Sequence, residues 1–171
     1  MVRRKEAQAS SLLIVVAAVI LYCIHIPAAE VGLYPGAPFV HRLLYPFFHA
    51  NWLHLAVNCW ALLSIVFLYQ ISLPMMASSF IIAASYPIGP LSFLYSGAIM
   101  PTVGLSGLCY ALLGRYSFIF SDNRRSRLKY HAWFAVFIGI GFFFPQSNAW
   151  LHLYCYLCGF ILAQLNRPIA I

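Results

Sequence analysis

The chain has 171 residues, of which 63% are hydrophobic and only 8% are charged, and its mean hydropathy is +0.85. A soluble domain carries about 25% charged residues, so the composition excludes an ordinary soluble domain and indicates an integral membrane protein. The net charge of +7 does not predict nucleic-acid binding, because the basic residues lie at the ends of apolar segments. We expect one membrane domain over residues 1–171.

Long apolar segments follow one another along the chain. A helix that crosses a bilayer needs about 20 mostly apolar residues, and the sequence predicts an all-α, polytopic bundle of six such helices. The predicted helices cover approximately residues 11–29, 49–69, 73–93, 105–120, 131–144 and 148–165. The helical core therefore spans residues 11–166, and residues 1–10 are predicted to form a cytoplasmic tail.

The basic residues predict how the bundle is oriented, because cytoplasmic loops are rich in lysine and arginine. Arg3, Arg4 and Lys5 precede the first helix, the loop 121–130 holds four more basic residues, and Arg167 follows the last helix. Both termini are thus expected in the cytoplasm, and the second, fourth and sixth helices begin on the outer side. The expected location is a cell membrane, the inner membrane in a bacterium.

The segment 31–48 is too long and too apolar for a plain loop. Gly32, Pro35 and neighbouring glycine and proline residues interrupt any regular element there. We expect this segment to lie in the outer interface, with Arg42 reaching toward headgroups or polar backbone and Tyr45 facing hydrocarbon.

Each helix that begins on the outer side carries polar residues near its start. These residues include His54 in the second helix, Ser106 in the fourth and His152 in the sixth. A polar side chain in a hydrocarbon-like setting costs free energy unless it is paired or used. Their common depth suggests acyl-transfer chemistry inside a membrane.

The spacing of three polar residues in the second predicted helix indicates which of them share a helix face. His54 and Asn58 are four residues apart and share one helix face, where they could stabilise an oxyanion. His49 and His54 are five apart, about 140° around the helix, which argues against a paired-histidine zinc site and fits His49 serving the loop before it. The alternative is that all three only form hydrogen bonds between helices.

Ser106 lies in the run Gly104-Leu105-Ser106-Gly107. The glycines permit close approach of the backbone to a ligand or a neighbouring helix, and the first amides of a helix that starts here are unpaired donors. Taken alone, the run is more typical of helix packing through small residues.

His152 is the candidate general base for Ser106. The chain has three acidic residues, of which Glu6 and Asp122 are expected on the cytoplasmic side and Glu30 at the outer end of the first helix. A Ser-His-Asp triad is therefore not predicted, and a Ser-His dyad remains. Tyr110 lies four residues after Ser106 and could stack on the imidazole.

The combined motifs resemble those of the rhomboid intramembrane serine proteases. Residues 49–58 resemble the family pattern H-x-x-x-x-H-x-x-x-N, and residues 104–114 resemble G-x-S-G-x-x-Y-A-L-x-G. His152 and Gly159 resemble the histidine and packing glycine of the last helix. The resemblance covers roughly residues 36–164 and departs at Cys155, where a glycine is common, and at His41-Arg42, where Trp-Arg is frequent.

The resemblance implies a serine endopeptidase that cleaves transmembrane or juxtamembrane segments of membrane proteins without a metal or other cofactor. It implies that Ser106 is the nucleophile, His152 the base, and that His54, Asn58 and the Ser106 amide form the oxyanion hole. It also implies that His49 supports the outer loop and that Tyr110 stacks on His152.

Three alternatives stay open at this point. The chain could be a catalytically inactive rhomboid-like protein that binds membrane clients, or a transporter. As a protease, it could also be a sorting-type rhomboid that trims C-terminal anchors.

Overall fold

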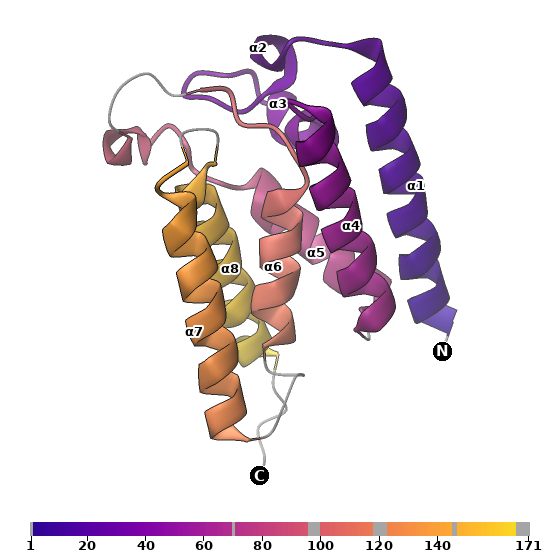
Figure 1. Cartoon of the computed structure of the whole chain (residues 1–171), viewed down its shortest axis with the longest axis vertical. Coiled ribbons are helices and arrows are strands. Elements are labelled where there is room, and N and C mark those ends of the chain that lie inside the picture. Colours follow the sequence, from indigo (N-terminus) through magenta and orange to yellow (C-terminus); the bar gives the residue numbers. More distant parts are fainter. Residues whose placement is uncertain (1, 70, 96–99, 118–122, 145–146, 167–171) are drawn as a thin grey trace.

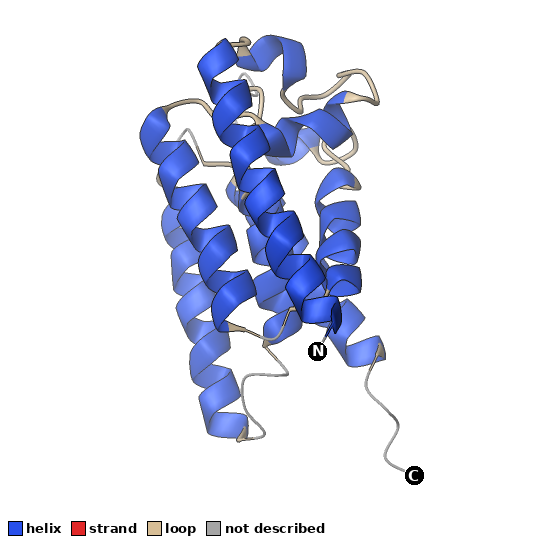
Figure 2. Ribbon diagram, turned by 90° about the vertical axis from the view of Figure 1, so that its right-hand side faces the viewer, coloured by secondary structure: helices blue, strands red, loops and turns tan. Residues whose placement is uncertain are grey.

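The computed structural model describes residues 2–69, 71–95, 100–117, 123–144 and 147–166. In chain order the elements are α1 (Val2–Ile24), α2 (Ala28–Val31), α3 (His41–Leu44), η1 (Tyr45–Phe47), α4 (Trp52–Leu68), α5 (Leu73–Ala84), η2 (Ser92–Leu94), α6 (Ser106–Tyr116), α7 (Arg124–Gly141) and α8 (Ala149–Leu165). Over these residues the chain is all-helical (Figure 2). One isolated antiparallel bridge pairs Leu33 with Thr102.

The longer helices stand side by side and alternate in direction (Figure 1). The starts of α4, α6 and α8 lie at one end of the bundle, together with α2 and α3 (Figure 1). The start of α1 and the end of α8 lie at the other end. The arrangement therefore places the polar residues near the three helix starts at a common level, as the sequence predicts.

The helix boundaries differ from the predicted ones at three places. α1 already begins at Val2, so the predicted tail is helical, while its cytoplasmic placement stays a prediction. α5 ends at Ala84 rather than near residue 93, three residues before Pro87, which cannot supply a helical N–H. α7 begins at Arg124.

The early start of α7 corrects the expectation of a basic loop. Asn123 caps the helix, because its side chain accepts a hydrogen bond from the Arg125 amide over 2.9 Å. The basic residues that follow are good helix formers. They therefore occupy the first two turns of an 18-residue helix.

Length and hydropathy alone do not establish six membrane spans. Among the described residues, one helix, Arg4–Ile24, is by itself long and apolar enough to cross a bilayer. His41–Phe47 and Trp52–Leu68 pass the same test together, across a 94° bend. The all-helical bundle is consistent with a membrane protein, and the six-span form stays a prediction.

The centre of the bundle is the contact between α6 and α8. A Cβ atom on Gly114 would overlap the carbonyl oxygen of Tyr156, and one on Gly159 would overlap that of Ala111. Small residues let helix backbones approach closely where no hydrophobic force between helices is available. The two glycines therefore hold α6 and α8 in backbone contact and fix the relative position of their starts.

α6 also fills the space between α8 and the N-terminal helices. Leu105, Leu108 and Leu112 are almost completely buried and pack in one cluster with Leu62 and Val66 of α4. The helix that the sequence predicts to carry the nucleophile is thus enclosed by other helices of the protein. This helix, α6, is only 11 residues long.

Replacing Gly159 with alanine should destabilise the protein, because the new Cβ meets the Ala111 backbone and α6 and α8 must separate. Overpacking of this kind costs about 1–3 kcal/mol. Thermal unfolding in detergent should show a clearly lower midpoint. Gly139→Ala is the matched control, since a Cβ there meets nothing within 4 Å and alanine favours a helix. Equal midpoints for the two variants would contradict this account of the α6–α8 contact.

Candidate active site

Ser106 and His152 are in direct hydrogen-bond contact. The Ser106 Oγ and His152 Nε2 atoms are 2.8 Å apart, although 46 residues separate them in the chain. Ser106 is the first residue of α6, and His152 lies in the first turn of α8. A nucleophile within hydrogen-bond reach of a base is the arrangement that activates a serine hydroxyl.

The imidazole of His152 is held by an aromatic ring. Tyr110 lies one turn after Ser106, and its ring stacks on that of His152 with centroids 4.4 Å apart and planes at 22°. The described carboxylates Glu6 and Glu30 are exposed, and no hydrogen bond joins either of them to His152. Stacking is therefore the contact that orients this ring.

Gly104 brings the ring of His54 to the serine. Its φ of +114° is a conformation that glycine adopts at no steric cost. Its amide donates to the Tyr45 carbonyl over 2.9 Å. A Cβ here would lie 2.8 Å from both Cε1 and Nε2 of His54. The absence of a side chain thus lets the His54 ring rest on the backbone two residues before Ser106.

His49 and Asn58 both contact His54. The His49 and His54 rings meet edge to face, with centroids 5.1 Å apart. Asn58 is buried, and its Nδ2 donates to the His54 carbonyl over 2.8 Å. Its Oδ1 is buried without a hydrogen-bond partner. An amide nitrogen carries two hydrogens, so Asn58 keeps one further donor beyond the bond to its own helix.

Tyr45 lies beneath the site, which corrects the expectation that it faces hydrocarbon. It is fully buried, and its hydroxyl donates to the Ala83 carbonyl over 3.0 Å. A Cβ on Gly107 would lie 3.1 Å from this hydroxyl and 3.5 Å from the Cys155 sulfur. Gly107 therefore makes room for Tyr45, and Cys155 fits at the place where the family often has glycine.

Asn148 joins several segments near the starts of α6 and α8, a role that the sequence alone does not predict. Its Oδ1 accepts from the Leu151 amide at 3.0 Å and from the Tyr95 hydroxyl at 2.8 Å. Its Nδ2 donates to Thr102 Oγ1 over 2.8 Å. Burial raises the pKa of Tyr95, so the phenol stays a donor. The one sequence feature that indicates part of this role is an asparagine at the predicted start of a helix, which is a common N-cap.

Arg42 confirms the expectation that it reaches polar backbone. Its guanidinium donates to the carbonyls of Ala84 and Tyr86 over 3.2 and 2.6 Å. His41 also pairs with backbone, since its Nδ1 lies 2.8 Å from the Gly32 carbonyl oxygen. The Arg42 contacts fasten the segment before α4 to the end of α5, and the His41 contact joins two parts of that segment to each other.

The fold and this polar cluster define a helical protein with a serine-histidine pair at one end of a glycine-packed bundle. A family model described as Rhomboid domain matches residues 38–168, and the chain belongs to the rhomboid family. This family is embedded in membranes, and its members are generally intramembrane serine proteases. Comparison with curated proteins and with solved structures gives no match.

Replacing Gly104 with alanine should displace the His54 ring, because the new Cβ would lie 2.8 Å from it. Reaction of Ser106 with a fluorophosphonate probe should then fall well below that of the wild type. Gly36→Ala is the control: Gly36 also has a positive φ, +84°, but a Cβ there meets nothing within 4 Å. Both variants bear backbone strain of about 1–2 kcal/mol. Equal probe reaction in the two variants would show that His54 does not depend on Gly104.

Proposed function

We propose that this chain is an intramembrane serine endopeptidase that cleaves transmembrane or juxtamembrane segments of membrane proteins. The observation that carries the proposal is the 2.8 Å contact between Ser106 Oγ and His152 Nε2, in a chain of a family whose members are generally proteases of this kind. The proposed orientation has both termini in the cytoplasm, so that the site lies in the outer half of the bilayer.

In the proposed reaction, Ser106 Oγ attacks the scissile carbonyl carbon while its proton passes to His152 Nε2. The C–N bond then breaks, the imidazolium returns the proton to the leaving amine, and an ester links the acyl part to Ser106. Water, deprotonated by His152, attacks this ester and releases the acid and the free serine. The Tyr110 stack keeps the imidazole in place through both proton transfers.

The tetrahedral intermediates carry a negative oxygen that needs donors. The Ser106 amide lies in the first turn of α6, where backbone N–H groups lack intrahelical partners. The His54 ring rests against Gly104, two residues before Ser106, and Asn58 retains a second amide hydrogen. We assign these three groups to the oxyanion hole, with His49 supporting His54 through the ring contact.

Removal of either member of the dyad should abolish activity. Ser106→Ala and His152→Ala should each lose detectable cleavage of a model membrane substrate and reaction with a fluorophosphonate, because neither group alone makes a serine nucleophile. Glu30→Gln should retain most activity, since Glu30 is exposed and no hydrogen bond joins its carboxylate to Ser106 or His152. A folded but inactive Glu30→Gln enzyme would contradict the dyad. A folded wild type that neither reacts nor cleaves would favour the client-binding alternative.

Loss of a side-chain donor of the oxyanion hole should slow turnover rather than abolish substrate binding. Removal of one such donor typically costs about 10²–10³ in turnover, and His54→Ala and Asn58→Ala should each approach this range. The measurement is kcat for a membrane-embedded substrate. His25→Asn is the control, at an exposed histidine whose positive φ asparagine tolerates. Full turnover in both site variants would show that the side chains of α4 take no part in the reaction.

A further inference from the structure

A second hydrogen bond joins the two stretches of chain that carry Ser106 and His152. Asn148 Nδ2 donates to Thr102 Oγ1 over 2.8 Å, beside the 2.8 Å contact between Ser106 and His152. Thr102 lies four residues before Ser106, and Asn148 lies four residues before His152. Both bonds join residues that are 46 positions apart. The two contacts therefore share one register between α8 and the chain that enters α6.

The orientation of the Asn148 amide is set by its other partners. The Leu151 amide lies 3.0 Å from Oδ1, and a backbone N–H only donates, so this atom is the oxygen. The Tyr95 hydroxyl donates to the same oxygen over 2.8 Å. Because a hydroxyl has one hydrogen, Tyr95 accepts from the hydroxyl of the buried Tyr86 at 2.6 Å. The nitrogen of the Asn148 amide is thereby directed to Thr102.

The backbone of Thr102 is held on its other side. Thr102 and Leu33 exchange two backbone hydrogen bonds, of 2.8 and 2.9 Å. Two residues further on, the Gly104 amide donates to the Tyr45 carbonyl. Thr102 is therefore a fixed point to which Asn148 can tie the start of α8.

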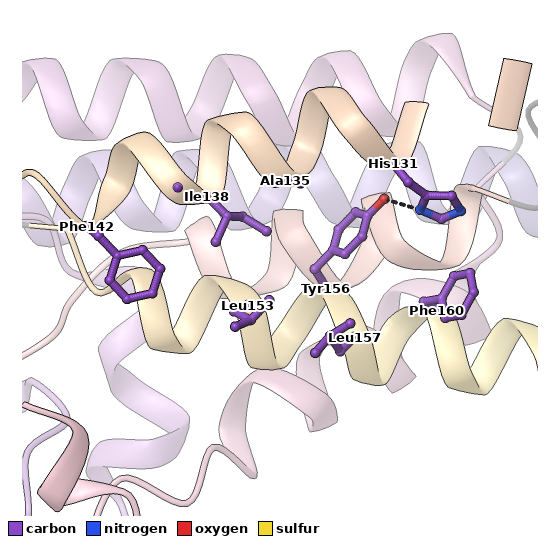
Figure 3. A pocket seen from close by; sticks show the side chains of 9 residues that line it. His131, Ala135, Ile138, Phe142, Leu153, Tyr156, Leu157 and Phe160 are labelled. Carbon is purple, nitrogen blue, oxygen red and sulfur yellow. Dashed lines mark hydrogen bonds between the residues drawn. The ribbon is translucent and has the colours of Figure 1, made fainter. Parts of the chain in front are cut away.

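α7 packs loosely on α8. A groove of about 430 Å³ lies between the two helices (Figure 3). The hydrogen bond between His131 and Tyr156, at one end of this groove, meets α8 one turn beyond His152 (Figure 3). At the other end, the half-exposed Phe142 meets Trp150 edge to face. The α7 side therefore gives His152 little support, and contacts on other faces of α8 must position it.

The glycine contact between α6 and α8 fixes their separation at a point far from the pair. Gly114 lies eight residues after Ser106, about 12 Å along a helix. A tilt of about 5° about this contact would move Ser106 by about 1 Å, and a displacement of about 1 Å can cost about 10²-fold in rate. Ser85 binds Tyr154 at 3.0 Å, which holds α8 against α5 rather than against the chain of Ser106. These contacts alone therefore leave the distance between Ser106 and His152 open.

We propose that Asn148 is a positioning residue, which holds His152 in register with Ser106 through its bond to Thr102. Its effect reaches His152 directly along α8, because the His152 amide donates to the Asn148 carbonyl over 3.1 Å. The consequence for turnover rests on the proposed proteolysis, whereas the geometric role concerns the resting protein. Loss of the side chain should leave both helices folded and let the pair separate.

Steady-state kinetics distinguish positioning from stability. Asn148→Ala should lower kcat for a membrane-embedded substrate by about 10–10²-fold per active site and leave KM nearly unchanged, with active sites counted by exhaustive fluorophosphonate labelling. Asn123→Ala is the matched control, because Asn123 caps α7 by accepting from the Arg125 amide. It should lower the unfolding midpoint as the loss of a cap does, while its kcat stays that of the wild type.

Variants of Thr102 test the bond from its other end. Thr102→Val keeps the shape of the side chain and removes the acceptor, so kcat should fall by about tenfold. Thr102→Ser keeps the hydroxyl and should restore kcat. Combined with Asn148→Ala, Thr102→Val should cause no further fall, because the two side chains act through one bond.

Nitrogen NMR of protein with isotopically labelled histidine observes the pair without catalysis. The His152 Nε2 resonance is identified by its shift in Ser106→Ala, which lacks the hydroxyl bound to this atom. Asn148→Ala should move the resonance toward its position in Ser106→Ala. Asn123→Ala should leave it in place.

Three results would overturn the proposal. They are equal kcat values in Asn148→Ala and Asn123→Ala, additive losses in the double variant, and an unmoved His152 resonance in folded Asn148→Ala. If Asn148→Ala does not fold, Thr102→Val takes its place in the kinetic and NMR measurements. A wild type that does not react with the fluorophosphonate would contradict the proposed protease, and the His152 resonance would still decide the role of Asn148.

Discussion

The backbone contact between α6 and α8 is the constraint on which the rest of the structure depends. Gly114 and Gly159 lack the Cβ atoms that would collide with the facing backbone, and the hydrogen bond between Ser106 and His152 lies at one end of the resulting contact. A lipid-embedded bundle gains little from hydrophobic burial between helices. Close packing therefore does here what a large apolar core does in a soluble enzyme: it makes the position of two side chains reproducible.

Polar contacts complete this positioning at the end of the bundle where the pair lies. Tyr45 binds α5 through its hydroxyl and the Gly104 amide through its carbonyl, and Arg42 binds the backbone that follows α5. Most of these bonds end on backbone carbonyls rather than on other side chains. Such bonds satisfy buried backbone without introducing paired charges, whose desolvation is costly.

The sequence was sufficient for the all-helical class, the placement of the long helices and the contacts of Ser106, His152 and Tyr110, because these rest on local periodicity and on a specific combined motif. It was insufficient for Tyr45 and the start of α7. An apolar-looking tyrosine gives no sign that it is buried by tertiary contacts, and a run of arginines is compatible with both a loop and a capped helix. The Asn148 contacts join residues up to 53 positions apart, which no local pattern reveals.

The side chain of Asn148 acts as donor and acceptor at once, with partners in three separate segments. Helix caps are ordinarily interchangeable among serine, threonine, aspartate and asparagine. Here aspartate would need the Thr102 hydroxyl to turn and donate, and a hydroxyl residue would be too short to reach the same partners. A change of this one cap therefore alters contacts of three segments at once: the start of α8, the chain that follows η2 and the chain that precedes α6.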